Sequence, residues 1–208
     1  MNLVNKSWGA FSPEVALAYL KTFGHPAQGS KLILLDILAK ISNLQGNPSV
    51  LDLGCGNGQL YEYFKSHGLT CEYTGIDFSE ILLSVARSRN PEAKFIKGDI
   101  NQLSTLVNKK FDYIIYSHVI EMLESPELSL LEAKKVTDCV MIRFFEPPEF
   151  EVDTVELREM DLGKGHVPYL RRKMSKSYYQ LILANVGCRR VDVYRDNSSK
   201  DQVHVLYF

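Results

Sequence analysis

The sequence predicts an α/β fold in which a mostly parallel sheet of seven strands carries helices on both faces. From residue 49 onward, short apolar segments alternate with segments of helical period, as in parallel sheets with crossover helices. The first apolar segment runs directly into a turn that contains Gly54, Gly56 and Gly58. The last two apolar segments flank the polar turn 196–201, which indicates an antiparallel hairpin at one edge of the sheet.

The order of the elements follows from the apolar periods and from their stop signals. Ser12 and Pro13 predict the start of a helix over 12–22, and a second helix is expected over 30–41. Strands are expected at 49–53, 72–76, 94–97, 111–116, 138–144, 188–195 and 202–208. Further helices are expected at 58–67, 79–89, 124–135 and 176–186, with a loop or short helix near 101–107.

Residues 149–176 interrupt this alternation. The segment follows Pro147–Pro148 and has two extended stretches around the turn 162–165, which predicts a hairpin. We expect this insertion and residues 1–22 to fold as a lid over the carboxyl ends of the fourth and fifth strands. Their aromatic residues can enclose an apolar ligand or simply pack in the core: Trp8, Phe11, Tyr19 and Tyr169.

Composition excludes several classes of protein. The chain has 208 residues, of which 45% are hydrophobic, enough for one sizeable core. Its 24 basic and 25 acidic residues give no electrostatic footprint for general nucleic-acid binding. The four cysteines contain no Cys-x-x-Cys pair and indicate neither a zinc site nor a disulfide framework. The longest apolar run, 32–38, is too short to span a bilayer, and no secretory signal is visible, so we expect a cytoplasmic protein.

The glycine turn indicates a nucleotide pocket that does not hold a pyrophosphate. A dinucleotide fingerprint requires a third glycine where Gln59 stands, and no Lys-Ser/Thr pair of a phosphate loop follows. Asp52, two residues before Gly54, suits a ligand that is positively charged there. S-adenosylmethionine has a sulfonium, an ammonium and a carboxylate but no phosphate, and the N–H groups at the start of the helix can receive its carboxylate.

Four stretches resemble, in order, the motifs of the class I S-adenosylmethionine-dependent methyltransferases. LDLGCGNGQL at 51–60 resembles motif I, and residues 73–87, 95–100 and 111–123 resemble motifs II, III and IV. The resemblance covers residues 49 to about 145 and implies one Rossmann-like methyltransferase domain over 1–208. Its expected parts are an N-terminal helical cap (1–45), a cofactor-binding core (46–148), the insertion or lid (149–176), and a C-terminal helix with strands (177–208).

The resemblance implies roles for individual residues in the cofactor pocket. Asp77 would accept hydrogen bonds from the ribose hydroxyls, Phe78 would pack on the adenine, and Asp99 and the backbone of Ile100 would contact its ring. Each has a structural alternative: a helix cap for Asp77, core packing for Phe78 and a turn for Asp99. The other expected cofactor-binding residues are Asp52, Gly54, Cys55, Gly56, Asn57, Gly58 and Ser117.

Motif IV departs from two subclasses that it partly resembles. It lacks the Asn/Asp-Pro-Pro-Tyr/Phe stretch of enzymes that methylate DNA amino groups. It is closer to the Glu-Val-hydrophobic-Glu-His stretch of ubiquinone-pathway and small-RNA methyltransferases, but His118 and Met122 replace the first glutamate and the histidine. We therefore expect no metal at His118 and Glu121. His118 is interpreted either as a general base near the sulfonium or as a residue that shapes the pocket.

The expected reaction is methyl transfer to an O, N or C atom of a small-molecule acceptor, including acceptors from natural-product or secondary metabolism. The product would be S-adenosylhomocysteine, and substrate contacts are expected from Tyr19, Glu146 and Tyr169. Two alternatives stay open: an RNA or protein methyltransferase that uses the basic run 171–176, and a non-catalytic cofactor-binding module. That run is otherwise a solvated face. No nucleic-acid or membrane partner is expected, and the protein is expected to be a monomer or homodimer.

Overall fold

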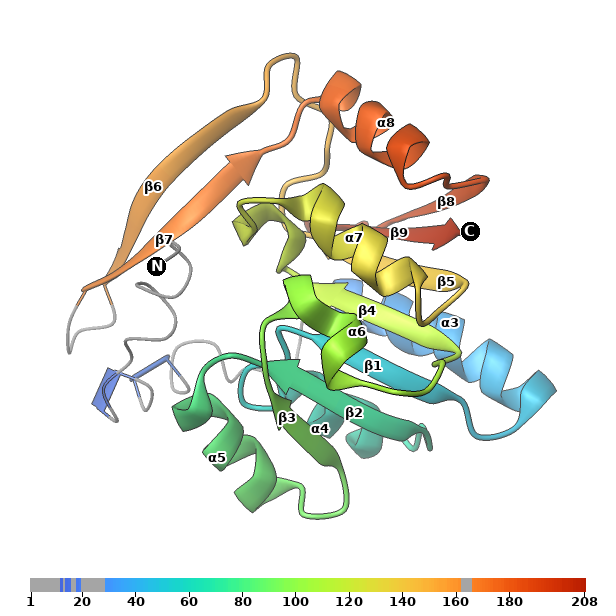
Figure 1. Cartoon of the computed structure of the whole chain (residues 1–208). Coiled ribbons are helices and arrows are strands. Elements are labelled where there is room, and N and C mark those ends of the chain that lie inside the picture. Colours follow the sequence, from blue (N-terminus) through green and yellow to red (C-terminus); the bar gives the residue numbers. More distant parts are fainter. Residues whose placement is uncertain (1–11, 13, 16–17, 20–28, 162–165) are drawn as a thin grey trace.

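The computed structural model describes residues 12, 14–15, 18–19, 29–161 and 166–208. Seven of its strands form one sheet (Figure 1): β1 (Ser49–Leu53), β2 (Glu72–Asp77), β3 (Lys94–Lys97), β4 (Tyr113–Ser117), β5 (Cys139–Phe144), β8 (Arg190–Arg195) and β9 (Gln202–Tyr207). The longer helices are α3 (Gly29–Gln45), α4 (Gln59–Ser66), α5 (Glu80–Arg89), α7 (Pro126–Lys134) and α8 (Lys176–Asn185). Shorter helical segments are α6 (Leu103–Leu106), η2 (Ile100–Gln102) and η3 (Ile120–Met122).

The large sheet has the strand order β3–β2–β1–β4–β5–β9–β8. The first five strands pair in parallel, whereas β9 is antiparallel to both β5 and β8. The structure thus confirms the mostly parallel, seven-stranded Rossmann-like sheet with an antiparallel hairpin at its C-terminal edge. The strand order reverses between β1 and β4, and ligands of such sheets bind beyond the carboxyl ends of the strands at this point.

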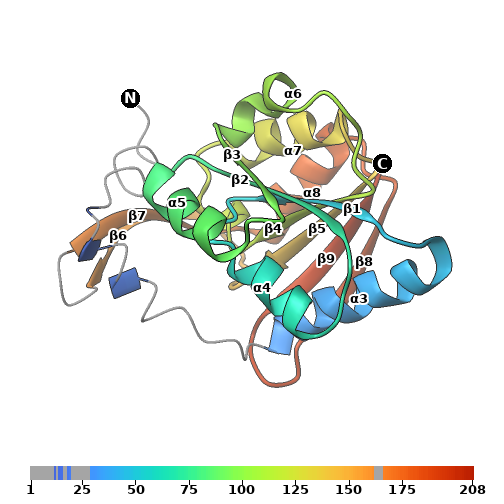
Figure 2. The same cartoon turned by 90° about the horizontal axis from the view of Figure 1, so that it is seen from below.

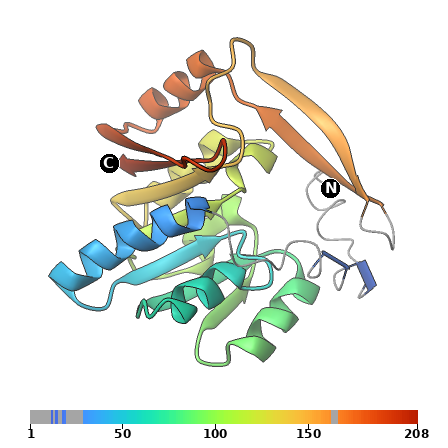
Figure 3. The same ribbon diagram turned by 180° about the vertical axis from the view of Figure 1, so that it is seen from behind.

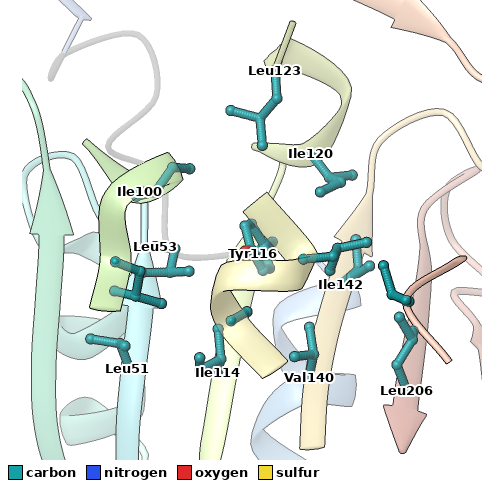
Figure 4. Close-up of a cluster of buried hydrophobic side chains, with 14 of the residues drawn as sticks. Leu51, Leu53, Ile100, Ile114, Tyr116, Ile120, Leu123, Val140, Ile142 and Leu206 are labelled. Atoms are coloured by element: carbon teal, nitrogen blue, oxygen red, sulfur yellow. The ribbon is translucent and has the colours of Figure 1, made fainter. Parts of the chain in front are cut away.

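Helices cover both faces of the sheet, as the alternation of elements predicts. Figures 1 and 3 show α6, α7 and α8 on one face and α3, α4 and α5 on the other. Because successive strand residues point to opposite faces, Leu51 and Ile114 enter the core of the first face, while Val50 and Ile115 enter that of the second. Figure 4 shows the first of these cores, with side chains from β1, β4, β5 and β9 in one layer.

The helix starts follow the capping signals where the structure describes them. The N–H of Val15 donates to Ser12 Oγ (3.2 Å), as expected for a helix that begins at Ser12. Most of the expected helix 12–22, together with Trp8 and Phe11, lies outside the described residues. The expected helix 124–135 is shorter than predicted, because α7 begins at Pro126.

The insertion forms the expected hairpin. Strands β6 (Thr154–Asp161) and β7 (His166–Lys173) pair in antiparallel register, and the tip 162–165 lies outside the described residues. Figure 2 shows the hairpin standing apart from the large sheet. None of the helices that the structure describes is long and apolar enough to cross a membrane.

Candidate active site

A cavity of about 580 Å³ lies at the carboxyl ends of the parallel strands. Its walls come from the glycine turn after β1, the ends of β2 and β4, the start of η2, and the hairpin β6–β7. The volume is within the range of roughly 300–1,000 Å³ that is typical of small-molecule sites. Motif residues and insertion therefore face one shared space, which agrees with the expected lid for residues 149–176.

The glycine turn brings backbone, rather than side chains, to the cavity wall. Gly54 and Gly56 have φ angles of 75° and 55°, a region that glycine adopts without steric penalty. A Cβ atom on Gly54 would lie 2.6 Å from Val119 Cγ2, so no larger residue fits there without a rearrangement. Gly58 is not among the lining residues; it has a φ angle of 79° and packs near Phe95 at the start of α4.

Asp52 presents a buried carboxylate oxygen that the protein does not satisfy. Its side chain lines the cavity, Oδ2 accepts a hydrogen bond from Tyr73 Oη (2.6 Å), and Oδ1 has no partner among the described residues. Burial raises the pKa of Asp52 to about 7, against the opposing effect of the Tyr73 hydrogen bond. A ligand ammonium would both satisfy Oδ1 and favour the ionised carboxylate.

Three donors near Asp52 suit an anionic group. The amide nitrogens Asn57 Nδ2 and Gln59 Nε2 are buried at the start of α4 and have no partner among the described residues. Lys31 on α3 is also buried and lines the cavity. Burial lowers the pKa of Lys31 to about 8, and Arg143 adds to this effect. Sequence reasoning missed Lys31, because its helix carries no recognisable motif.

Asp77 is fixed at the end of β2 by two backbone hydrogen bonds. Its Oδ2 accepts from Gly56 N (2.9 Å), and its Oδ1 accepts from Ser79 N (2.8 Å). The cap of α5 is Ser79, whose Oγ accepts from Leu82 N, so the helix-cap alternative for Asp77 is not what the structure shows. Each carboxylate oxygen keeps a second lone pair for a ligand hydroxyl.

The other expected cofactor residues also line the cavity, and two of them have structural bonds as well. Phe78, Ile100 and Cys55 are lining residues. Asp99 caps η2, since its Oδ1 accepts from Asn101 N (2.9 Å), and it lines the cavity too, so both interpretations of Asp99 are compatible with the structure. Ser117 Oγ accepts a hydrogen bond from Arg143 Nη1 (2.9 Å).

His118 lies at the acceptor side of the cavity with an uncommon backbone. Its φ angle is 58°, a positive value that it shares with no other non-glycine residue among those described. Its Nε2 lies 3.0 Å from Asp201 Oδ2. Asp201 and Arg143 are residues that sequence reasoning missed, because Asp201 is part of what looks like an ordinary polar turn.

Glu121 does not join His118 in a metal site. Its Oε1 accepts hydrogen bonds from the backbone N–H groups of Phe145 (2.7 Å) and Glu146 (3.1 Å). Among the residues described, no group of three His, Cys, Asp or Glu side chains has the arrangement of a metal site.

The expected substrate residues divide into two groups. Tyr19 and Tyr169 line the cavity, whereas Glu146 is not a lining residue and accepts a hydrogen bond from Arg171 Nε (3.2 Å). The expectation that the basic run forms a solvated face is wrong for its first two members. Arg171 and Arg172 are buried, and Arg172 forms an ion pair with Asp153.

Comparison with known proteins identifies one domain family. Residues 51–138 match the model of the methyltransferase domain family. The chain is 42% identical over 65 residues to trans-aconitate 2-methyltransferase of Sinorhizobium medicae, an alignment that covers 31% of this chain and 25% of that protein. The enzyme of that name from an Enterobacter species is 28% identical over 174 residues, or 77% of this chain and 63% of that protein. The chain thus matches less than two thirds of the length of these relatives.

Solved structures share the whole fold at low sequence identity. The CcbJ methyltransferase of Streptomyces caelestis superimposes with a TM-score of 0.69 at 15% identity, covering 100% of this chain and 99% of that one. CalS10, an amino pentose methyltransferase from Micromonospora echinaspora, gives a TM-score of 0.65 at 14% identity, covering 91% and 95%. At these identities the likeness concerns the fold.

Proposed function

Because the chain carries a class I S-adenosylmethionine-dependent methyltransferase domain, we propose that it binds S-adenosylmethionine and transfers its methyl group to a small-molecule acceptor. The observation that carries this proposal is the convergence of Asp52, the glycine turn, Asp77 and the hairpin on one cavity. A phosphate-bearing cofactor fits the site less well, since the buried Asp52 carboxylate would face its negative charge.

The buried polar atoms that the protein leaves unsatisfied match the groups of this cofactor. Asp52 Oδ1 would receive the ammonium, while Asn57, Gln59 and Lys31 would receive the carboxylate. Asp77 would receive the ribose hydroxyls, and Phe78 with Asp99 would receive the adenine. When bound, S-adenosylmethionine supplies an activated methyl group and leaves as S-adenosylhomocysteine.

The chain itself contributes position and enclosure. Holding two reacting groups in line can lower a barrier by roughly 7–11 kcal/mol relative to the reaction of free partners. The hairpin places Tyr169 and Met160 on the cavity wall opposite the motif residues, where they exclude water that would compete with the acceptor.

Two observations favour a small acceptor over RNA or protein. The relatives and structural neighbours named above are, by their names, enzymes of trans-aconitate and of an amino pentose. In addition, Arg171 and Arg172 are buried and ion-paired, so they do not offer the exposed basic stripe that the polymer alternative requires.

The proposal is tested by supplying S-adenosylmethionine labelled at its methyl group, with pools of small metabolites, RNA and protein as separate acceptors. We expect label in a small-molecule pool and formation of S-adenosylhomocysteine. Label that enters only RNA or protein would refute the acceptor class, and failure to bind S-adenosylhomocysteine would refute the cofactor.

A further inference from the structure

We propose that His118 and Asp201 form a proton-accepting pair, and that the methyl acceptor is therefore a hydroxyl group of an alcohol or phenol. The inference rests on the proposed function and specifies its acceptor. It distinguishes this chain from enzymes whose acceptor is a carboxylate, because a carboxylate is already ionised at neutral pH and needs no base.

The backbone holds His118 at the cavity in a conformation that costs free energy. A non-glycine residue in the left-handed region is disfavoured by roughly 1–2 kcal/mol, and His118 has a φ angle of 58°. Its N–H donates to Arg143 O (2.9 Å), and its ring meets that of Phe145 edge-on, with centroids 5.6 Å apart. Such strain persists where the surroundings enforce it and is common at functional sites.

Asp201 fixes which ring nitrogen of His118 carries the proton. Asp201 Oδ2 accepts hydrogen bonds from Ser30 Oγ (2.6 Å) and Arg143 Nη2 (3.3 Å), and it lies 3.0 Å from His118 Nε2. Burial raises the pKa of Asp201, but the hydrogen bonds from His118 and Ser30 outweigh it and hold that pKa below its usual value. An ionised carboxylate can only accept, so the neutral imidazole carries its proton on Nε2.

The other ring nitrogen is left to the cavity. Nδ1 of His118 has no hydrogen-bond partner among the described residues, and the side chain, which lines the cavity, is 21% exposed. The neutral tautomer set by Asp201 therefore presents a lone pair on Nδ1 toward the acceptor side of the site. This is the arrangement that a general base requires.

The charges around His118 keep it neutral and favour an oxygen acceptor. Burial lowers the pKa of His118, Asp201 opposes this effect, and Arg143 and Arg171 lower the pKa further. The same two guanidinium groups would stabilise the negative charge that develops on an acceptor oxygen as it loses its proton. They would disfavour a protonated amine at the same place.

The proton and electrons balance in a single step. The hydroxyl proton passes to Nδ1 of His118 while an oxygen lone pair forms the new bond to the methyl carbon. The old bond between carbon and sulfur breaks, and its electron pair stays on the sulfur. The imidazolium of His118, stabilised by Asp201, then releases its proton to water.

The protonation state is tested without any acceptor by ¹⁵N NMR of the histidine-labelled full chain saturated with S-adenosylhomocysteine. The variant His118→Gln assigns the signal. We expect the wild type to show Nε2–H and unprotonated Nδ1, with a titration midpoint below 6.5. Asp201→Asn removes the carboxylate that favours the imidazolium, so the midpoint should fall. The control Ser30→Ala removes a neighbouring bond to the same oxygen but leaves the charge, and the midpoint should not fall.

The acceptor class is tested by offering methyl-labelled S-adenosylmethionine with three separate pools: alcohols and phenols, amines, and carboxylic acids. We expect label in the hydroxyl pool, and a kcat that is 10²- to 10⁴-fold lower for His118→Gln with little change in KM. For Asp201→Asn the fall in kcat should be smaller. Label in the amine or acid pool, or Nδ1–H in the wild type, would overturn the inference. Binding of S-adenosylhomocysteine by calorimetry reports separately on the proposed cofactor.

Discussion

Asp52 and Asp77 end neighbouring strands, yet their carboxylates have different surroundings. Asp77 accepts two backbone N–H groups, which hold both of its oxygens in place. Asp52 accepts only the Tyr73 hydroxyl and keeps one buried oxygen without a partner among the described residues. The first arrangement suits neutral hydroxyl donors, and the second suits a cation, so the two residues should respond differently to substitution and to pH.

Replacing Asp77 by asparagine should weaken binding of S-adenosylhomocysteine by about 10- to 100-fold, equivalent to roughly 1.4–2.8 kcal/mol. The amide keeps one acceptor oxygen but loses the charge that strengthens bonds from the ribose hydroxyls. Calorimetric titration measures the change. The control is Glu80→Gln, which removes an exposed carboxylate paired with Arg87 on the same helix and should leave the affinity unchanged. Equal affinity of Asp77→Asn and the wild type would contradict the ribose role.

Asp52 should make both affinity and stability depend on pH. Its raised pKa means that the folded protein binds more protons than the unfolded chain between about pH 4 and pH 7. The stability contributed by the protonated form is therefore complete below about pH 4 and is lost as the pH rises through 7. The ionised form binds the ammonium, so cofactor affinity should fall as the pH falls below 7.

The matched variant is Asp52→Asn. We expect it to be more stable than the wild type at pH 8 by roughly 1–3 kcal/mol, since each unit of pKa shift corresponds to about 1.4 kcal/mol. Near pH 4 the two proteins should be equally stable, and the variant should bind S-adenosylhomocysteine more weakly at pH 8. Urea unfolding at both pH values checks this, and a variant less stable than the wild type at pH 8 would contradict the account.

Activity should survive chelation. Glu121 is occupied by two backbone N–H groups, and His118 is bonded to Asp201, so neither is arranged to share a metal. We expect the methyl-transfer rate to be unchanged in the presence of EDTA. A rate that is lost with EDTA and restored by magnesium or manganese would show that this part of the account is wrong.

Among the elements, the turn between β1 and α4 depends most strictly on its sequence. Gly54 and Gly68 have nearly the same φ angle, 75° and 76°, but a Cβ on Gly54 would lie 2.6 Å from Val119 Cγ2, whereas Gly68 has nothing within 4 Å. The pair separates the backbone effect from the steric effect of a side chain at the cavity wall.

We expect Gly68→Ala to lose roughly 1–2 kcal/mol of stability, the penalty of the left-handed conformation alone. Gly54→Ala should lose more, because Val119 must also move, and it should weaken S-adenosylhomocysteine binding, which Gly68→Ala should not. Thermal unfolding and calorimetry of both variants give the comparison. Equal losses of stability would mean that Val119 yields without penalty.

The strands and helices of the core could be predicted from the sequence, because their apolar periods are regular and Ser79 and Pro126 mark helix starts. The glycine turn, Asp77 and Asp99 were also identifiable, since motif spacing reflects local backbone requirements. Lys31 and Asp201 were not, because contacts such as that between Asp201 and His118, 83 residues apart, leave no periodic signal in the sequence. For the same reason, the burial of Arg171 and Arg172 was hidden in what looks like a solvated basic run.

At the scale of the whole molecule, the hairpin and the motif residues enclose one cavity from opposite sides (Figure 1). The hairpin contributes Tyr169, Arg158 and Met160 to the wall, which supports a role in choosing the acceptor. The N-terminal half of the expected lid is represented by Tyr19, since most of residues 1–22 lie outside the described part of the chain. The expectation of a monomer or homodimer stays a prediction.

The central claim is that this cavity binds S-adenosylmethionine and not a phosphate-bearing dinucleotide. Calorimetric titration of the wild-type protein with S-adenosylhomocysteine and, in a parallel experiment, with NAD tests it most directly. We predict stoichiometric binding of one S-adenosylhomocysteine per chain that weakens below pH 7, and no measurable heat of binding with NAD. Binding of NAD in preference to S-adenosylhomocysteine would contradict the account.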